Sequence, residues 1–183
     1  MRDSIQDVLH FWFEETVPSQ WFQVSDVFDE MVRDRFSGLY QMALNGVCDE
    51  WARDVDGALA LVLIFDQFPR NMFRDLPQSF ATDDRARDVS RKVIDLGYDH
   101  LVGVAKRRFF YLPFEHSEDI EDQKTSLILF EKMRDEEPLS YDYALRHYKI
   151  IERFGRFPHR NSILGRENTA EERQFLDEYG RGF

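Results

Sequence analysis

Several features that define common protein classes are missing from this sequence. Cys48 is the only cysteine, which excludes an intrachain disulfide, a CxxC redox motif and a thiolate zinc site. The longest apolar run, residues 58–65, is far shorter than the roughly 20 residues that span a bilayer, and the first residues lack the apolar core of a signal peptide. Glycine-rich phosphate loops and GxSxG nucleophile elbows are also missing. We therefore expect a soluble, cytoplasmic protein.

Positive charge is scarce as well. The chain has 24 lysines and arginines against 35 acidic residues, for a formal net charge of -11. Such a chain repels phosphate groups, so we expect neither nucleic acid nor a membrane as a partner. One segment differs from the rest: between Arg153 and Arg166 there are four arginines and one histidine but no acidic residue. We refer to residues 153–166 as the late basic segment, and an anion would bind there most readily.

Apolar residues recur at helical spacing along nearly the whole chain, and no segment shows the period of two that is typical of strands. The sequence predicts an all-α fold of about eight antiparallel helices, as a bundle or a tetratricopeptide-repeat-like (TPR-like) array, in a single domain covering residues 1–183. Ser4, Ser117 and Thr169 are the expected N-terminal caps, and Thr169 is expected to form a capping box with Glu172. Pro69 and Pro113 are expected to stop helices, because proline cannot donate the helical hydrogen bond. The expected helices cover about residues 4–14, 25–45, 56–68, 82–96, 99–112, 117–134, 140–154 and 169–179.

Two similar polar turns follow predicted helices, Phe68-Pro-Arg-Asn71 and Phe157-Pro-His-Arg-Asn161. In a structural interpretation, each arginine donates to the last helical carbonyls while the asparagine takes a left-handed conformation. In a functional interpretation, these turns bind a carboxylate or a phosphate, which guanidinium groups hold with two hydrogen bonds. The candidate ligand-binding residues are Arg70, Asn71, Arg156, Arg160 and Asn161.

A third polar stretch is Pro113-Phe-Glu-His-Ser-Glu-Asp119. His116 with Glu118 or Asp119 could act as an acid/base pair, and His147 or His159 could complete a metal site. The alternative is ordinary capping of a helix by Ser117, with His147 as a satisfied core residue. Asp66 ends an apolar helix and would need a cation if buried, most simply an arginine of the late basic segment.

Five stretches of this chain together resemble one known family. They are Leu9-His-Phe-Trp-Phe13; Trp21-Phe22; Leu59–Asn71; Tyr111–Glu118 with Gln123; and Arg153–Asn161 with Leu164-Gly-Arg166. The set, which covers about residues 8–176, resembles the bacterial domain of unknown function 924. The resemblance implies a helical fold similar to TPR proteins, and it implies no reaction. Members often carry methionine where Glu115 stands, which argues against Glu115 as an essential acid.

Two functional hypotheses follow from these residues. In the first, a small anionic ligand binds at the late basic segment, with His116, Glu118 and His159 as candidate catalytic residues, no metal assigned and the cofactor unknown. In the second, a TPR-like helical module binds a peptide or a partner protein, and the motifs serve packing.

Overall fold

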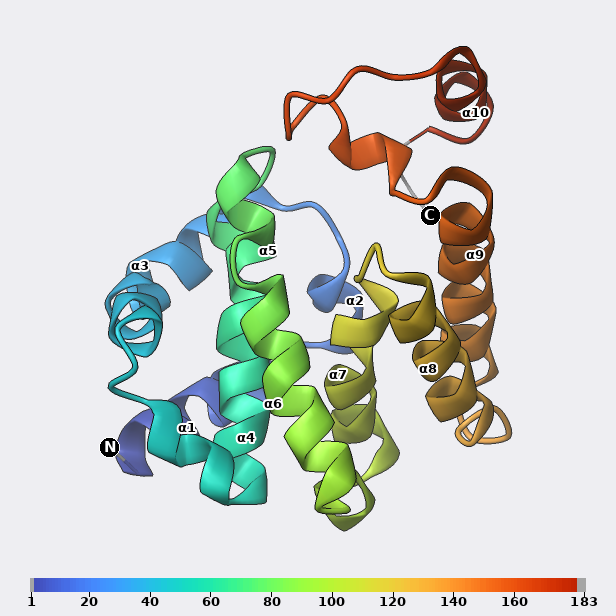
Figure 1. Cartoon of the computed structure of the whole chain (residues 1–183). Helices are drawn as coiled ribbons and strands as arrows, with labels where there is room; N and C mark the ends of the chain where they lie inside the picture. The colour runs from blue at the N-terminus through green and yellow to red at the C-terminus, as the bar shows by residue number, and fades with distance from the viewer. Residues whose placement is uncertain (1, 181–183) are drawn as a thin grey trace. The chain divides into compact units, whose positions relative to one another are not determined.

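A computed structural model of the chain describes residues 2–180 (Figure 1). Within this range the regular structure is helical and contains no strand, which confirms the all-α prediction. No helix in the described range is both long and apolar enough to cross a membrane. The described residues form two compact units: unit 1 runs through Arg74 and includes Gln78–Phe110, and unit 2 contains Asp75–Pro77 and continues from Tyr111. The prediction of one domain over residues 1–183 stays a prediction.

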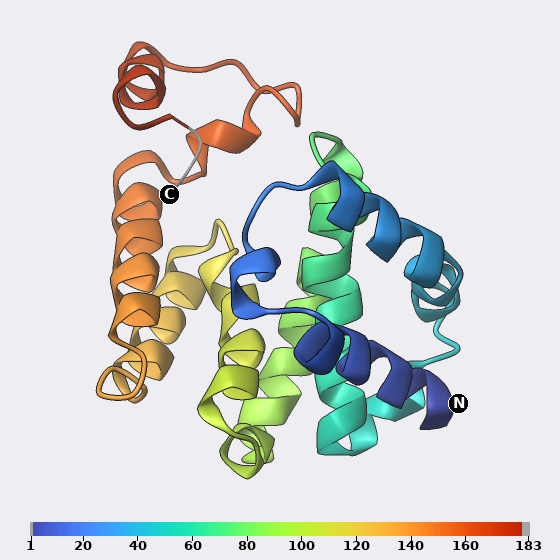
Figure 2. The ribbon, with the colours of Figure 1, turned by 180° about the vertical axis from the view of Figure 1, so that it is seen from behind.

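Unit 1 is built around α4 and the helical turns that continue it. In Figures 1 and 2, α1 and α6 pack against α4, and α3 packs against α5. Every residue from Ala58 to Phe65 is almost fully buried, as expected for a segment that is apolar on all sides. The helices of this unit are α1 (Arg2–His10), α2 (Pro18–Trp21), α3 (Asp26–Leu44), α4 (Val55–Val62), α5 (Phe68–Met72), α6 (Asp83–Asp95) and the first part of α7 (Val104–Glu115).

The central helix of unit 1 continues through Pro69, where the sequence predicted its end. A π-helical turn, Leu63–Gln67, joins α4 to α5 and the chain stays helical to Met72. Because Pro69 has no N–H, it cannot serve the carbonyl of Phe65 four residues earlier. The hydroxyl of Thr82 donates to that carbonyl at 2.6 Å. A side chain from the start of α6 therefore supplies the hydrogen bond that proline removes.

The N-terminal helix of unit 1 also departs from the prediction. Ser4 lies inside α1, so it is not the N-terminal cap, and a second π-helical turn, Phe11–Glu15, follows α1. This turn leaves the carbonyl of Trp12 accessible to two side-chain donors, Trp21 Nε1 at 2.9 Å and Thr16 Oγ1 at 2.6 Å. The Trp12 and Trp21 rings stack with centroids 6.2 Å apart, and this anchors the start of the chain to the core of unit 1.

Unit 2 contains an antiparallel helix pair, α8 (Ile120–Glu131) and α9 (Pro138–Phe154), followed by a 3₁₀ turn (Pro158–Arg160) and α10 (Ala170–Tyr179) (Figure 1). Gly155 follows α9 with φ 67°, a left-handed conformation that stops the helix, and α9 ends at Phe154 as the sequence predicted. Thr169 and Glu172 form the predicted capping box of α10. Ile150, Ile151 and Phe157 form a small core against which Phe154 and Phe175 pack.

The junction between α7 and α8 differs from the predicted one. Pro113 lies inside α7, which continues to Glu115, and Asp119 rather than Ser117 is the N-terminal cap of α8. The Nε2 amide of Gln123 donates to the carbonyls of Glu115 at 2.6 Å and Ser117 at 2.8 Å. These bonds satisfy carbonyls at the last residue of α7 and in the loop that follows it.

Candidate functional site

In unit 1, Arg70 binds two buried carboxylates. Its Nη1 lies 3.2 Å from Asp66 Oδ1, and its two Nη atoms donate to the two oxygens of Asp83 at 3.0 and 3.1 Å. Burial alone lowers the pKa of Arg70, but the charges of Asp66 and Asp83 outweigh it and the pKa is raised. The sequence indicated an arginine of the late basic segment as the partner of Asp66; the structure shows Arg70 at this carboxylate, four residues along the same helical stretch.

The neighbouring Asn71 is also bound to a carboxylate of unit 1. Asn71 Nδ2 donates to Asp29 Oδ1 at 2.8 Å, and Arg74 donates to both oxygens of Asp29 at 2.5 and 2.7 Å. Asp29 is 4% exposed. Asn71 lies within α5 and Asn161 has φ -58°, so the left-handed conformation expected for both asparagines is wrong. These contacts give Arg70 and Asn71 a structural role, and their predicted ligand-binding role stays a prediction.

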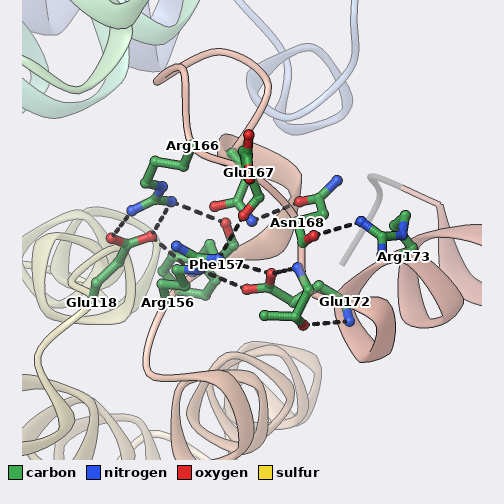
Figure 3. Close-up of polar contacts among 10 residues, drawn as sticks. Glu118, Arg156, Phe157, Arg166, Glu167, Asn168, Glu172 and Arg173 are labelled. Carbon is green, nitrogen blue, oxygen red and sulfur yellow. Dashed lines mark hydrogen bonds and ion pairs between the residues drawn. The ribbon is translucent and has the colours of Figure 1, made fainter.

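In unit 2, Glu118 joins the α7–α8 junction to the late basic segment (Figure 3). Its carboxylate accepts from Arg166 Nη1 at 2.7 Å, from Arg166 Nη2 at 2.9 Å and from the backbone N–H of Phe157 at 2.8 Å. Burial alone raises the pKa of Glu118, but the hydrogen bonds from Arg166 and Phe157 outweigh it and the pKa is lowered. At neutral pH Glu118 is therefore an ionised acceptor and a poor proton donor.

A second ion pair of unit 2 connects Arg156 with Glu172 (Figure 3). Arg156 Nε and Nη2 donate to the two carboxylate oxygens at 2.6 and 2.8 Å, and Oε2 also accepts from the backbone N–H of Thr169 at 2.7 Å. The hydrogen bond from Arg156, helped by the Thr169 N–H, lowers the pKa of Glu172 to about 2. Glu172 is 2% exposed, so this pair fixes the N-terminus of α10 to the end of α9.

Arg160 and Asn161, two further candidates of the late basic segment, also form hydrogen bonds within unit 2. Arg160 Nη2 donates to the backbone carbonyl of His116 at 2.9 Å, and its guanidinium lies 4.5 Å from the centre of the Phe157 ring. Asn161 Nδ2 donates to Asn168 Oδ1 at 2.7 Å. The structure thus brings His116 and Arg160 together through a backbone carbonyl of the former.

His147 is held firmly within unit 2. Its Nδ1 lies 2.9 Å from the carbonyl of Tyr143 and 3.3 Å from Glu115 Oε1. A carbonyl can only accept, so Nδ1 carries a proton. The edge of the His147 ring also faces Phe157, with centroids 5.4 Å apart. These contacts are those of the satisfied core histidine that the sequence allowed as one alternative.

His159 is a candidate residue that lines a pocket of unit 2. The pocket has a volume of about 260 Å³, and its walls are Pro158, His159, Ser162, Asn168, Leu176 and Gly180, all of them in unit 2. The side chains supply an imidazole, a hydroxyl and an amide beside the apolar surfaces of Pro158 and Leu176. Across the described range, no group of three or more His, Cys, Asp or Glu side chains is arranged to hold a metal ion.

Some acidic partners of the arginines were not identified as such from the sequence. Asp29 and Asp83 had no distinguishing signal, because acidic residues are common near helix N-termini. Glu172 was identified through its capping box with Thr169, but its second role at Arg156 was not. Arg166 belonged to the late basic segment, and only its contact with Glu118 shows that it neutralises a carboxylate.

Of the comparisons with known proteins, one names a family and none names an activity. A family model described as bacterial protein of unknown function, DUF924, matches residues 8–180. A solved structure, described as a protein of unknown function from Agrobacterium tumefaciens, is 41% identical to this chain, with a TM-score of 0.91. The match covers 97% of this chain and 98% of the other. A search of curated proteins found no match.

Proposed function

Because this chain belongs to the bacterial DUF924 family, whose function is unknown, we propose a function from its own geometry: unit 2 binds a small organic monoanion beside His159. The observation that carries the proposal is the pocket of about 260 Å³ that His159 lines. Of the residues predicted from the sequence to contact a ligand or take part in catalysis, His159 is one that reaches a pocket within a single unit.

The charges around the pocket favour a singly charged ligand. Arg156 and Arg166 are each paired with a carboxylate, so they contribute little net positive charge. The polar lining consists of His159, Ser162 and Asn168, which offer hydrogen bonds rather than fixed positive charges. A carboxylate needs few such donors, whereas a phosphate dianion would need more cationic compensation. Pro158 and Leu176 would contact a short apolar tail.

In this proposal the other predicted residues have supporting roles. Glu118 fixes the backbone N–H of Phe157 immediately before the pocket turn, and Arg160 fixes the carbonyl of His116. Glu118 is therefore assigned to positioning rather than to proton donation. If the site is catalytic, proton transfer falls to His159, because the imidazole is the titratable group of the pocket lining.

The proposal can be tested by calorimetric titration of the full chain with butyrate, butyramide and inorganic phosphate. We expect butyrate to bind and butyramide to bind at least about tenfold more weakly. We expect the protein to bind phosphate no more tightly than butyrate. His159→Asn should weaken butyrate binding at least about tenfold while changing the free energy of unfolding by less than about 1 kcal/mol.

A matched control is His100→Asn, which changes an exposed histidine of unit 1 whose side chain is 64% exposed. This control should bind butyrate as the wild type does. Equal binding of butyrate and butyramide, or equal loss in both histidine variants, would contradict an anion site at His159. A variant His159→Asn that unfolds early would instead assign His159 to packing.

A further inference from the structure

The outer face of α3 in unit 1 carries apolar side chains that stay in contact with solvent. Val27 is 73% exposed, and Met31 and Met42 are 47% and 45% exposed; Val24, just before the helix, is also 73% exposed. At 3.6 residues per turn, Val27, Met31 and Met42 lie within about 60° of one another on the helix surface. Gly38 lies between them, and a Cβ built there would meet no atom within 4 Å. An apolar stripe therefore runs along α3, the light-blue helix in Figures 1 and 2.

A ridge of acidic residues runs beside this stripe. Asp26, Glu30 and Asp34 are exposed and four residues apart, so their carboxylates lie in one row and repel each other. Within the range that the structure describes, none of these three carboxylates has a hydrogen-bond or ion-pair partner in the structure. We call these three residues the acidic ridge.

The two arginines of α3 form their hydrogen bonds elsewhere and make no ion pair with this ridge. Arg35 donates to both oxygens of Glu15 at 2.6 and 2.9 Å. Arg33 donates through Nε and Nη2 to the carbonyl of Met72, in each case at 3.1 Å. Among the described residues, the helix therefore presents three carboxylates without an ion-pair partner beside exposed apolar groups.

We propose that this face of α3 binds a cationic amphipathic helix of a partner protein. Apolar residues of the partner would cover Val27, Met31 and Met42, and its lysines or arginines would face the acidic ridge. Methionine side chains adapt readily to different apolar surfaces, and binding of an amphipathic helix to an apolar face is a common mode of recognition. The carboxylates that repel one another in the free protein would then be neutralised by the partner.

The charge of the face selects this occupant over two others. An anionic membrane surface would be repelled by the acidic ridge. A second copy meeting through the same face would place two acidic ridges near each other, since a two-fold interface pairs a surface patch with itself. The proposal gives the second hypothesis from the sequence a defined surface, and it is independent of the pocket in unit 2.

The test uses the full chain and a fluorescein-labelled peptide of about 18 residues, with leucine and lysine arranged as an amphipathic helix. Its binding is measured by fluorescence anisotropy at physiological salt. We expect saturable binding, and we expect the double variants Glu30→Lys/Asp34→Lys and Val27→Ser/Met31→Ser each to raise Kd at least about tenfold. A scrambled peptide of the same composition should bind more weakly than the amphipathic one by a similar factor.

A matched control separates this face from the overall acidity of the chain. Asp135→Lys/Glu136→Lys changes the net charge as much as Glu30→Lys/Asp34→Lys does, but at two exposed residues of unit 2. This control should leave Kd within about twofold of the wild type. Equal weakening in both charge variants, or equal binding of the scrambled peptide, would reduce the effect to non-specific attraction and overturn the proposal. The proposal would also be overturned if Val27→Ser/Met31→Ser changed the sedimentation of the protein but not its binding of the peptide. A second copy of the chain would then occupy this face.

Discussion

In unit 1 the segment Phe68-Pro-Arg-Asn71 is helical, whereas in unit 2 Phe157-Pro-His-Arg-Asn161 forms a 3₁₀ turn after a helix has ended. Pro69 lies in the middle of a helical stretch, and its missing hydrogen bond is replaced by Thr82. Pro158 begins its turn, where its N–H would have had no partner in any case. The same residue types thus lie in two settings: Pro69 removes a helical hydrogen bond that another residue must replace, whereas Pro158 removes none.

The partners of the arginines differ in the same way. Arg70 is clamped between the carboxylates of Asp66 and Asp83, while Arg160 contacts a carbonyl of His116 and the ring of Phe157. The second turn has one residue more, His159, and this residue lines a pocket. A Phe-Pro-Arg-Asn motif therefore does not define a site, because the same residue types lie inside a helix in unit 1 and in a 3₁₀ turn beside a pocket in unit 2.

The largest expected effect is the loss of the clamp in unit 1. Arg70→Met should lower the free energy of unfolding by about 3–5 kcal/mol, because it leaves the fully buried Asp66 and the nearly buried Asp83 without this cation. Urea denaturation followed by tryptophan fluorescence measures it, since Trp12, Trp21 and Trp51 all lie in unit 1.

Arg53→Met is the matched control for Arg70→Met. Arg53 pairs with Glu50 at the surface, where the two side chains are 78% and 68% exposed. Such a pair contributes less than about 1 kcal/mol. Similar losses in the two variants would mean that Arg70 acts through general electrostatics and not as a clamp.

A smaller effect is expected from the charge pair in unit 2. Glu172→Gln should lower the free energy of unfolding by about 2 kcal/mol at pH 7, because Arg156 and the Thr169 N–H then face a neutral amide. Since unit 2 contains no tryptophan among its described residues, far-UV circular dichroism during urea denaturation is the suitable measurement.

The pH dependence of Glu172→Gln tests whether the charge of Glu172 is responsible for this stabilisation. The pKa of Glu172 is lowered to about 2 from an ordinary 4.5, so its stabilising contribution is fully present above pH 4.5 and is lost as the pH falls toward 2. The difference in unfolding free energy between the wild type and Glu172→Gln should therefore shrink over that interval. A difference that stays constant from pH 6 to pH 3 would show that the charge of Glu172 is not responsible.

The sequence predicted the secondary structure class, the end of α9 at Phe154 and the capping box of α10, because each depends on residues close together in the chain. It predicted helix ends at Phe68 and Leu112 that the structure does not have. At Pro69 the reason is a hydroxyl 13 residues beyond the proline, and no local rule identifies it.

The candidate site was predictable in composition but not in contacts. The late basic segment stood out in an acidic chain, yet Arg156 and Arg166 are paired with Glu172 and Glu118, which lie 16 and 48 residues away. Pairing over such separations depends on how helices pack, which apolar periodicity does not specify. The pocket at His159 could not be predicted, because its walls come from the 3₁₀ turn, the following loop and α10 together.

The smallest effect concerns the hydroxyl of Thr82, which replaces the hydrogen bond lost at Pro69. Thr82→Val should cost about 1–2 kcal/mol, because the buried carbonyl of Phe65 loses the donor that replaces the missing N–H of Pro69. In the background of Pro69→Ala, an N–H is restored to the helix, and the same Thr82→Val substitution should cost about 1 kcal/mol less.

Thr125→Val in α8 is the control. The Thr125 hydroxyl donates to the Glu121 carbonyl on a more exposed helix surface, so this substitution should cost little in either background. If Thr82→Val costs the same with proline and with alanine at position 69, Thr82 stabilises α6 independently of the proline. The π-helical turn would then be the feature that accommodates Pro69.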